Sequence, residues 1–496
     1  MGVSASAISR VTGVEVTPKN FNKGNASMLP QRLVIVGQGN DDAIYSLDKY
    51  ECDGSAASVA ERFGYGSPLH LAARQLFPTA GSMATFPVTI LPVKAGEKFI
   101  AAKGSLTLTG EAASAASRIT ITVGGLEILV TVAKGENLFA INQEIVRVIN
   151  AESDRCVTAL LVPGSEGNPD VIELTARWSG SLGNRIGLSV DGDIPGIAIT
   201  LASFADGAGV PDVDEALAKI GEIWETFILD TFDYKDGESP SALLDVYEEW
   251  GEGAWDVLAK RGGLVAHGCT DDYATRTAIT DARPTDRINF LIESVGAPEL
   301  PFVVGARGLL DILTTADKNP AQNYKGTLKG IKRGSDAAQE SYVVRNQAVM
   351  KGASTSIPNG SVAELNDVVT FYHPTSAGKY PAWRYVVDAV KLMNIVYNLR
   401  LITESDEVKG APLVPDSQAT TNPTAVQPKM FKTWFANLAV SLGEAALISD
   451  VEFTIENLEV KIDTENSKRI NYIFPVKVSG NVEVISGDVY FGQYLG

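Results

Sequence analysis

The chain has 496 residues, which is enough for roughly three domains of ordinary size and a large hydrophobic core. Its 42 Lys and Arg residues against 60 Asp and Glu residues give a formal net charge of -18, which disfavours binding to nucleic acid or to an anionic membrane surface. No stretch approaches the length of apolar sequence that spans a membrane, and the N-terminus lacks the pattern of a secretory signal, so we expect neither membrane insertion nor export.

The first segment, residues 1–31, has too few apolar positions to fill a core of its own. They are spaced among Ser, Thr, Gly, Asn and Pro, and this pattern predicts an extended N-terminal arm. The candidates for contact with another subunit are its apolar residues Val3, Ile8, Val11, Val14 and Val16.

An α/β pattern follows the arm. Residues 33–37 form a continuous apolar run that ends in glycine, which is typical of a strand buried on both faces. Ser67 and Pro68 then begin a predicted helix, as its cap and its first-turn residue, and residues 86–93 form the next predicted strand. This order of strand, helix and strand indicates an α/β layer.

From 94 to 209 the sequence becomes rich in alternating Thr, Ile, Val and Gly. The predicted strands cover residues 105–109, 119–123, 126–132, 157–162, 171–176 and 186–190, and one helix covers residues 138–150. Gly124 and Gly125 predict a hairpin turn between two of the strands. We interpret this block as a β-rich domain inserted between two halves of the α/β domain.

The α/β pattern resumes near Asp212. Helical spacing of apolar residues from Val213 is followed by a predicted strand at 226–230 and helices at 243–250 and 255–258. Strands at 264–266 and 288–292 flank a predicted helix at 271–282, whose acidic start suits the helix dipole. The alternation predicts a three-layer α/β/α core, so that the chain as a whole is α/β, or α+β when the inserted domain is included.

The last part of the chain combines helices with a predicted hairpin. An amphipathic helix is predicted at 383–401, a loop at 413–428, and a second helix at 431–447 with Lys429 and Lys432 at its head. Residues 451–462 and 468–478 alternate apolar and polar side chains across a polar turn, which predicts a β-hairpin.

Alternation continues almost to the end of the chain. Residues 470–484 have the pattern of a half-buried strand, and apolar residues recur beyond it. The candidates for pairing with another subunit are Val482, Val484, Val489, Tyr490 and Phe491. Two chain ends of this kind offer backbone groups that a neighbouring copy can satisfy by strand addition, so the leading hypothesis is a polymer-forming subunit.

Few residues suggest catalysis. The sequence has no phosphate-binding loop, nucleophile elbow, His-Glu-x-x-His or Cys-x-x-Cys motif, and its three cysteines are far apart and predicted to be buried thiols. One cluster, residues 267–272 with His267, Cys269 and Asp271, follows a predicted strand, where α/β enzymes place catalytic groups. We therefore expect no catalytic, metal or cofactor residues, and an α/β enzyme with an accessory β domain remains the alternative.

The combination of arm, split α/β/α domain, inserted β domain and strand-forming end resembles the tail sheath protein of contractile bacteriophages, closest to the Mu-like group. The residues that carry the resemblance are 4–16, 32–39, 471–476 and 487–491. Divided in this way, the chain has the segments 1–31 (arm), 32–93 and 210–410 (sheath domain), 94–209 (outer insert), 411–484 (inner domain) and 485–496 (arm).

The resemblance implies a function as well as a fold. It implies subunits stacked as hexameric rings around a tail tube, with baseplate and tail terminator proteins as further partners, no cofactor, an outward-facing insert and a contraction that drives the tube through the host envelope. The protein would be assembled in the host cytoplasm and reside in the virion. The resemblance makes the helix with Lys429 and Lys432 a candidate for facing the tube, and the sheath of a phage-derived bacteriocin or secretion system would look alike.

Overall fold

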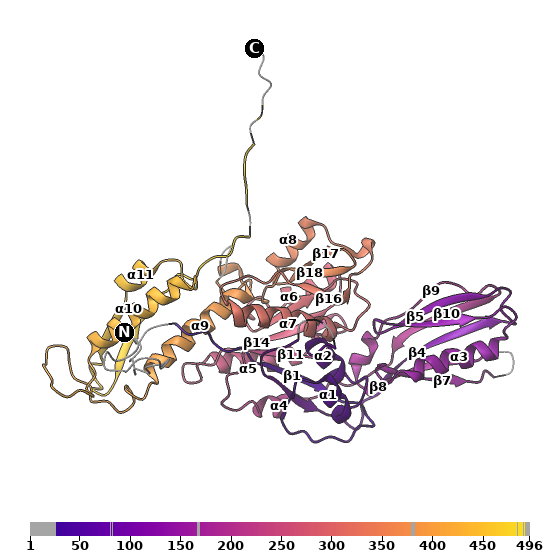
Figure 1. Ribbon diagram of the computed structural model, residues 1–496, viewed down its shortest axis with the longest axis horizontal. Coiled ribbons are helices and arrows are strands. Elements are labelled where there is room, and N and C mark those ends of the chain that lie inside the picture. The colour runs from indigo at the N-terminus through magenta and orange to yellow at the C-terminus, as the bar shows by residue number, and fades with distance from the viewer. Residues whose placement is uncertain are drawn as a thin grey trace, which may run out of the picture. The chain divides into compact units, whose positions relative to one another are not determined.

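The fold of the chain was analysed in a computed structural model, which describes residues 26–79, 81, 83–165, 169–377, 382–483, 485–489 and 491. The chain divides into two compact units (Figure 1). The larger unit runs from Leu29 to Met393, and the smaller one contains the chain from Asn394 onward together with the segment up to Met28.

A six-stranded sheet forms the centre of the larger unit. Its order is β15-β14-β11-β1-β3-β2, and all neighbours are parallel except the antiparallel pair β2 and β3. The strands are β1 (Leu33–Gln38), β2 (Tyr50–Glu51), β3 (Val88–Val93), β11 (Phe227–Asp230), β14 (Leu264–Cys269) and β15 (Asn289–Glu293). Every residue of the five parallel strands is buried, as the continuous apolar run at residues 33–37 predicted.

Helices cover both faces of this sheet, which confirms the predicted α/β class. On one face α4 (Asp214–Ala218) and α5 (Leu243–Trp255) pack in one cluster with the even-numbered β1 residues Val34 and Val36. On the other face lie α2 (Pro68–Leu76) and α7 (Pro301–Lys318), with α1 (Ala56–Phe63) beside α2. The predicted cap of α2 is confirmed, because the Ser67 side chain accepts a hydrogen bond from the backbone N–H of His70.

Helix α7 approaches the sheet closely at a glycine. A Cβ atom built on Gly268 of β14 would lie 1.6 Å from the carbonyl oxygen of Pro301, the first residue of α7. Only a residue without a side chain allows this contact. The predicted helix at 255–258 is wrong, since α5 is one continuous helix that ends at Trp255.

The described residues between 101 and 205 form two antiparallel sheets, one α-helix and one 3₁₀ helix. The four-stranded sheet has the order β10-β4-β8-β7 and the three-stranded sheet the order β6-β5-β9. These elements are β4 (Ala101–Gly110), β5 (Ser117–Val123), β6 (Leu126–Val132), α3 (Leu138–Ala151), β7 (Val157–Val162), β8 (Val171–Ser179), the 3₁₀ helix η1 (Ser181–Arg185), β9 (Leu188–Asp191) and β10 (Ile197–Ala205). Helix α3 packs against strands of both sheets.

The predicted hairpin between β5 and β6 is present. Val123 pairs with Leu126 across Gly124 and Gly125, whose φ angles are 55° and 84°. Positive φ at both central residues is the requirement of the tight turn that matches strand twist, and glycine meets it without strain. Strand β10 was not predicted.

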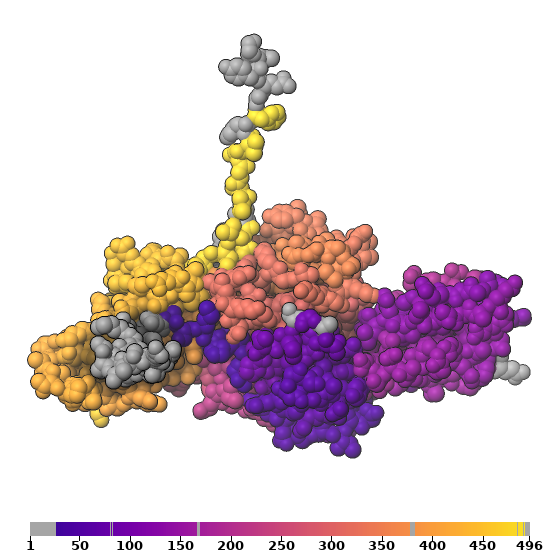
Figure 2. Space-filling model, viewed as in Figure 1, coloured from indigo at the N-terminus to yellow at the C-terminus, as the bar shows by residue number. Residues whose placement is uncertain are grey.

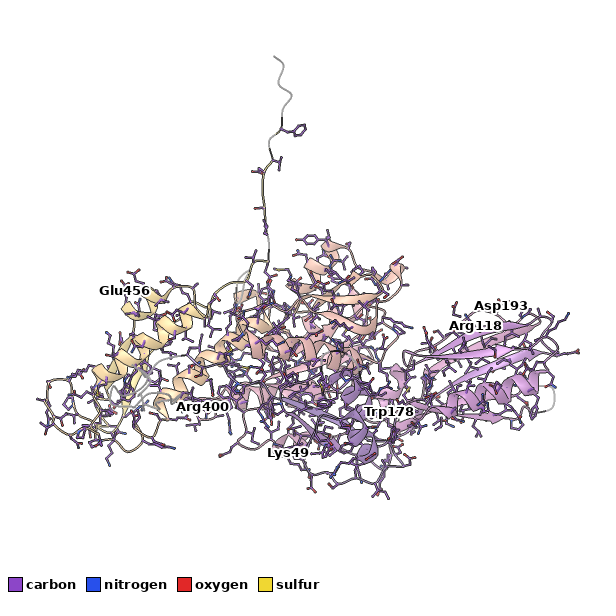
Figure 3. All side chains as sticks on the ribbon, in the orientation of Figure 1. Lys49, Arg118, Trp178, Asp193, Arg400 and Glu456 are labelled. Carbon is purple, nitrogen blue, oxygen red and sulfur yellow. The ribbon has the colours of Figure 1, made fainter. Side chains whose placement is uncertain are left out.

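This β-rich block, which we call the insert, is joined to the core sheet by side-chain contacts as well as by the chain. Figure 3 marks Trp178, a fully buried side chain of β8, at the end of the insert next to the core. Beside it, Asp41 accepts hydrogen bonds from the backbone N–H and the hydroxyl of Ser179 (3.1 and 2.6 Å), and Gln38 donates to the Ser179 carbonyl oxygen (2.7 Å). A Cβ atom on Gly66 would lie 2.0 Å from the Arg155 carbonyl oxygen, so the backbones of core and insert touch.

A further set of elements in the larger unit was not predicted from the sequence. A three-stranded sheet of order β16-β18-β17 lies after α7 along the chain, and α8 is part of the same segment. The elements are β16 (Thr327–Lys332), the 3₁₀ helices η2 (Asp336–Ala338) and η3 (Thr375–Ala377), α8 (Tyr342–Met350), β17 (Thr355–Asn359) and β18 (Val362–Asp367). The predicted helix at 271–282 is present as α6 (Tyr273–Asp281), and a short pair, β12 (Lys235–Asp236) and β13 (Ser239–Pro240), precedes α5.

The smaller unit is helical with a short hairpin. Helix α9 (Val386–Thr403) enters it, and α10 (Pro428–Glu444), α11 (Val451–Glu456), β19 (Glu459–Ile462) and β20 (Ile470–Ile473) follow. The prediction of an amphipathic helix is wrong for α9, because its residues from Val386 to Arg400 are all buried or half-buried and no exposed face alternates with an apolar one. No helix in the described part of the chain is long and apolar enough to cross a membrane.

The predicted hairpin is present but shorter than expected. Residues 451–456 form α11 instead of a strand, because Asp450 caps a helix there by accepting a hydrogen bond from the Phe453 backbone N–H (2.9 Å). The predicted strand at 470–484 is regular only over Ile470–Ile473. In the described residues beyond it, one isolated bridge joins Val478 to Ile448.

Candidate assembly surfaces

The cluster at 267–272 is the first candidate for chemistry, and the structure places it inside the core. His267 lies within β14 rather than after it, with no exposed surface. Its Nδ1 atom is 3.0 Å from Asp230 Oδ2 and its Nε2 atom is 2.9 Å from Asn289 Oδ1. The Asn289 amide is held in this orientation because its Nδ2 atom donates to Asp286 Oδ2 (2.7 Å) and to the Leu244 carbonyl oxygen (3.1 Å).

Both ring nitrogens of His267 therefore face acceptors. Each nitrogen lies within hydrogen-bonding distance of an oxygen atom on a neighbouring strand, so neither is free for another group. The other Asp230 oxygen accepts from the Tyr247 hydroxyl and the Phe232 backbone N–H (both 3.0 Å). The ring has no exposed surface and no nitrogen free to contact a substrate. We therefore assign this network to stabilising the sheet.

Cys269 is also unsuited to nucleophilic chemistry. Burial raises the pKa of its thiol to about 12, so the reactive thiolate is not populated near neutral pH. Its Sγ atom lies 3.4 Å from the Tyr234 hydroxyl, which donates to Asp271 Oδ2 at 2.8 Å. All three cysteines are free, as predicted, and Cys156 is buried like Cys269. The prediction of a buried thiol is wrong for Cys52, which is half-buried.

Asp271 serves as an anchor for the insert. Arg185 of the insert donates two hydrogen bonds to the Asp271 carboxylate (2.9 and 2.6 Å) and forms an ion pair with Asp233 (3.3 Å). Burial acts to raise the pKa of Asp271, but the hydrogen bond and charge of Arg185 outweigh it and hold that pKa below its usual range. The carboxylate at this strand end is thus used by a structural ion pair.

Charged side chains near the end of the neighbouring strand, β15, are also paired or buried. Arg276 of α6 is fully buried and makes a bidentate ion pair with Glu340 (both contacts 2.5 Å). Glu293 at the end of β15 is buried, and burial raises its pKa. No group of His, Cys, Asp and Glu side chains that could hold a metal ion occurs among the described residues.

The second candidate assembly surface has two parts, both in the smaller unit. One is the short hairpin of β19 and β20, and the other is the C-terminal segment, by which we mean the described residues from Val482 to Phe491. In the hairpin Glu459 pairs with Ile473 and Ile462 with Ile470, and β19 and β20 form a sheet of two strands. In the described part of the chain each strand therefore has one neighbour and one open edge. The ring of Tyr472 packs on Phe435 of α10 at a centroid distance of 4.8 Å, which fixes the hairpin to that helix.

The C-terminal segment is extended and exposes its apolar side chains. Figure 2 shows it as a narrow yellow strip. Val482 is 77% exposed, Val489 88% and Phe491 96%, and Ile485 between them is 88% exposed. Four large apolar side chains this exposed within ten residues are unusual for a folded protein, and their contact with another subunit stays a prediction. Val484 and Tyr490, also predicted here, lie outside the described residues, as do the five arm residues Val3, Ile8, Val11, Val14 and Val16.

The third candidate is the start of α10. Lys429 and Lys432 are exposed, whereas Phe431, Phe435 and Leu438 of the same helix are buried. Lysines in a first helical turn lie at the positive end of the helix dipole, where cations are disfavoured. Both lysines lie in the first turns of the helix, as the sequence predicted.

Comparison with known proteins supports a structural protein rather than an enzyme. The Mu-like prophage FluMu tail sheath protein of Haemophilus influenzae is 23% identical to this chain over 425 residues, which span 84% of each of the two chains. The resemblance to Mu-like tail sheath proteins indicated by the sequence is thereby confirmed. None of the known protein-family models matches the chain.

Two solved structures are also similar to it. The sheath tail protein of Listeria innocua is 11% identical with a TM-score of 0.48, and the match covers 92% of this chain and 94% of that one. For the sheath tail protein of Desulfitobacterium hafniense the identity is 11% and the TM-score 0.45, over 95% of this chain and 100% of the other.

Proposed function

We propose that this chain is the structural subunit of a contractile tail sheath, which polymerises as stacked hexameric rings around a tail tube and contracts to drive the tube through a host envelope. The main observation behind the proposal is that two features occur in the same unit. One is an apolar segment that is exposed as far as Phe491, and the other is a sheet of two described strands with open edges. The sheath protein to which the chain is similar over most of its length supports it.

The contact between subunits is strand addition. The C-terminal segment of one copy pairs with an open edge of the β19–β20 hairpin of the next, and the N-terminal arm supplies a further strand. About four ladder hydrogen bonds at a net ~1 kcal/mol each, with cross-strand pairs at roughly 0.2–1 kcal/mol, make one such joint modest. Each subunit makes several joints, so later contacts form at high effective concentration and the lattice is far stronger than one joint.

Such joints also permit contraction. The arms act as hinges while the folded bodies rotate and exchange side contacts, so that two lattice states interconvert without dissociation. The energy is stored in an extended lattice that the tube and baseplate hold, and the sequence has no nucleotide-binding motif that would supply it otherwise. Lys429 and Lys432 face the tube in this proposal, where an anionic surface would offset their unfavourable position at the helix start. The finished protein would reside in the virion tail.

The proposal is tested by deleting the chain from Ile485 onward. We expect a folded protein that no longer polymerises, because the described residues among those deleted are all exposed and the hairpin stays intact. Circular dichroism and thermal melting check the fold, and negative-stain electron microscopy checks assembly. The matched control is Phe139→Ser, which removes an exposed aromatic side chain (57% exposed) from the insert and should leave tubes unchanged. Sheath-like tubes formed by the truncated protein would contradict the proposal.

A further inference from the structure

A buried side chain of α9 ties down the N-terminal arm at Ser27. The backbone N–H of Ser27 donates a hydrogen bond to Asn398 Oδ1 (2.6 Å), and the Ser27 carbonyl oxygen accepts one from Asn398 Nδ2 (2.8 Å). Asn398 lies in α9 and is 1% exposed. Both residues belong to the smaller unit, and we call this pair of hydrogen bonds the arm clamp.

The Asn398 amide fits this contact in one orientation. Its Nδ2 atom also donates to the carbonyl oxygen of Asn394, one turn earlier in α9 (2.8 Å). With oxygen and nitrogen exchanged, Oδ1 would face two carbonyl oxygens and Nδ2 would face an N–H group. The orientation that satisfies all three contacts is therefore set partly by the helix itself, so the amide is positioned before the arm is added.

The arm clamp holds Ser27 by its backbone. An amide that accepts from the N–H and donates to the C=O of one residue makes the same two bonds as an opposite residue in an antiparallel sheet. The Ser27 side chain itself is exposed. Any residue with a backbone N–H can therefore occupy this position, whereas proline cannot donate the first bond.

The chain is fixed again shortly after the arm clamp. Leu29 is 3% exposed, and the backbone N–H of Arg32, directly before β1, donates to Thr226 Oγ1 (3.0 Å). The arm clamp thus immobilises Ser27 and Met28, which would otherwise move with the preceding residues. Two extended residues span about 7 Å, so loss of the clamp would give the arm that much slack.

The C-terminal segment is tied to the smaller unit in a different way. The backbone N–H of Ser449 donates to the Lys477 carbonyl oxygen (2.8 Å), and the backbone N–H of Ser479 donates to the Leu447 carbonyl oxygen (3.2 Å). These bonds join backbone to backbone. The tie at Ser27 instead depends on one side chain, so a single substitution can remove it and leave the backbone of the unit unchanged.

We infer that Asn398 is a positioning residue that fixes the point at which the N-terminal arm leaves the smaller unit. An arm that begins at a fixed point samples fewer positions than a slack one. It therefore meets its partner at a higher effective concentration and loses less entropy on binding. The inference rests on the proposed function for the partner of the arm, whereas the arm clamp itself is a contact within one chain.

Hydrogen exchange in the unassembled protein tests the arm clamp. Asn398→Leu keeps the volume of the side chain and removes its donor and acceptor, and circular dichroism checks that the variant is folded. The matched control is Ser27→Ala, which keeps both backbone groups. The amide of residue 27 should lose protection by about tenfold in Asn398→Leu and keep it in Ser27→Ala. Unchanged protection in Asn398→Leu, or an equal loss in Ser27→Ala, would overturn the clamp.

A double-mutant cycle tests the role of the arm clamp in assembly. Ser27→Pro removes the N–H group and places a ring carbon against Asn398 Oδ1. The protein concentration needed for tubes in negative stain should rise about tenfold in Asn398→Leu, in Ser27→Pro and in the double variant alike, because the second change finds the clamp already broken. Ser27→Ala should assemble as the wild type does.

The other outcomes separate this inference from the proposed function. Tubes at the wild-type concentration in both single variants, or effects that multiply in the double variant, would overturn the positioning role of Asn398 and leave the proposed function standing. A wild-type chain that never forms tubes would overturn the proposed function and the positioning role with it, even if hydrogen exchange shows the clamp.

Discussion

Replacing His267 with Ala should destabilise the larger unit strongly. The substitution leaves a cavity in place of the ring and removes the partner of two buried side chains, Asp230 and Asn289. Lost packing together with unpaired buried polar groups typically costs about 3–5 kcal/mol. The larger unit has about 365 residues, for which the unfolding entropy of ~2.1 cal/mol/K per residue converts this cost into a melting temperature lower by about 4–7 °C.

Differential scanning calorimetry of the intact chain measures this shift. The matched control is Cys269→Ala, on the same strand and equally buried, which removes a small neutral side chain and should lower the melting temperature far less. Assembly is then compared below the melting transition. A shift under about 1 °C for His267→Ala would refute the stabilising role of this network, and a fully folded variant that had lost its function would revive the enzyme alternative.

Substituting both residues in one variant is a poor test of the enzyme alternative. Substituting His267 and Cys269 together by Ala would be expected to leave assembly intact if both were merely unused. Because His267 is the hydrogen-bonding partner of two buried side chains, loss of assembly by the double variant would report instability instead of catalysis. The two residues must therefore be tested separately and at a temperature at which each variant is folded.

Three further outcomes are expected. Gly268→Ala should destabilise the fold by about 3 kcal/mol in urea titrations, since its Cβ would meet the Pro301 carbonyl oxygen and force α7 outward. Burial lowers the pKa of His70 to about 4, below the usual ~6.5, so the unfolded state binds more protons between these values. Stability should consequently fall as the pH drops from about 6.5 to 4, and His70→Gln should weaken that dependence. Arg185→Met leaves the Asp271 carboxylate without its main partner and should cost about 3 kcal/mol, with faster proteolysis between insert and core.

The core strands were predictable because they are buried on both faces. Continuous apolar runs such as residues 33–37 have no other stable place in a water-soluble fold. The hairpin of Gly124 and Gly125 and the Ser67 cap were equally predictable, since each depends on two or three adjacent residues.

The missed helices show the limit of periodicity. Helix α7 is buried along most of its length, including Arg307, so it shows no polar face that would mark a helix. Helix α11 has the sequence VEFTIE, in which apolar and polar residues alternate as they do in a strand. The segment is helical because the Asp450 side chain caps it by accepting a hydrogen bond from the Phe453 backbone N–H. The C-terminal strand ends at Ile473 because its partner β19 has only four residues, so alternation alone does not set the length of a strand.

The polar cluster around His267 could not have been resolved from sequence. His267, Asp230 and Asn289 lie on three different strands and meet only because β11, β14 and β15 are adjacent in the sheet. Cys269 and Asp271 looked like catalytic groups from their spacing, and only burial and the distant Arg185 showed them to be structural. The exposure of Phe491 likewise depends on what the rest of the chain leaves uncovered.

The position of the insert between β3 and β11 has a consequence for biosynthesis. Residues 94–209 are contiguous, so the ribosome delivers every strand of the insert's two sheets before β11 has been made. The core sheet is complete only after β14 and β15 have been made, and β15 ends at Glu293. Strand β11, one of the two neighbours of β1, lies almost two hundred residues after β1 in the chain. Pairing over such distances is slow compared with local pairing. We therefore expect the insert to fold first during translation, while β1 and β3 form only part of the core sheet until β11, β14 and β15 have been made.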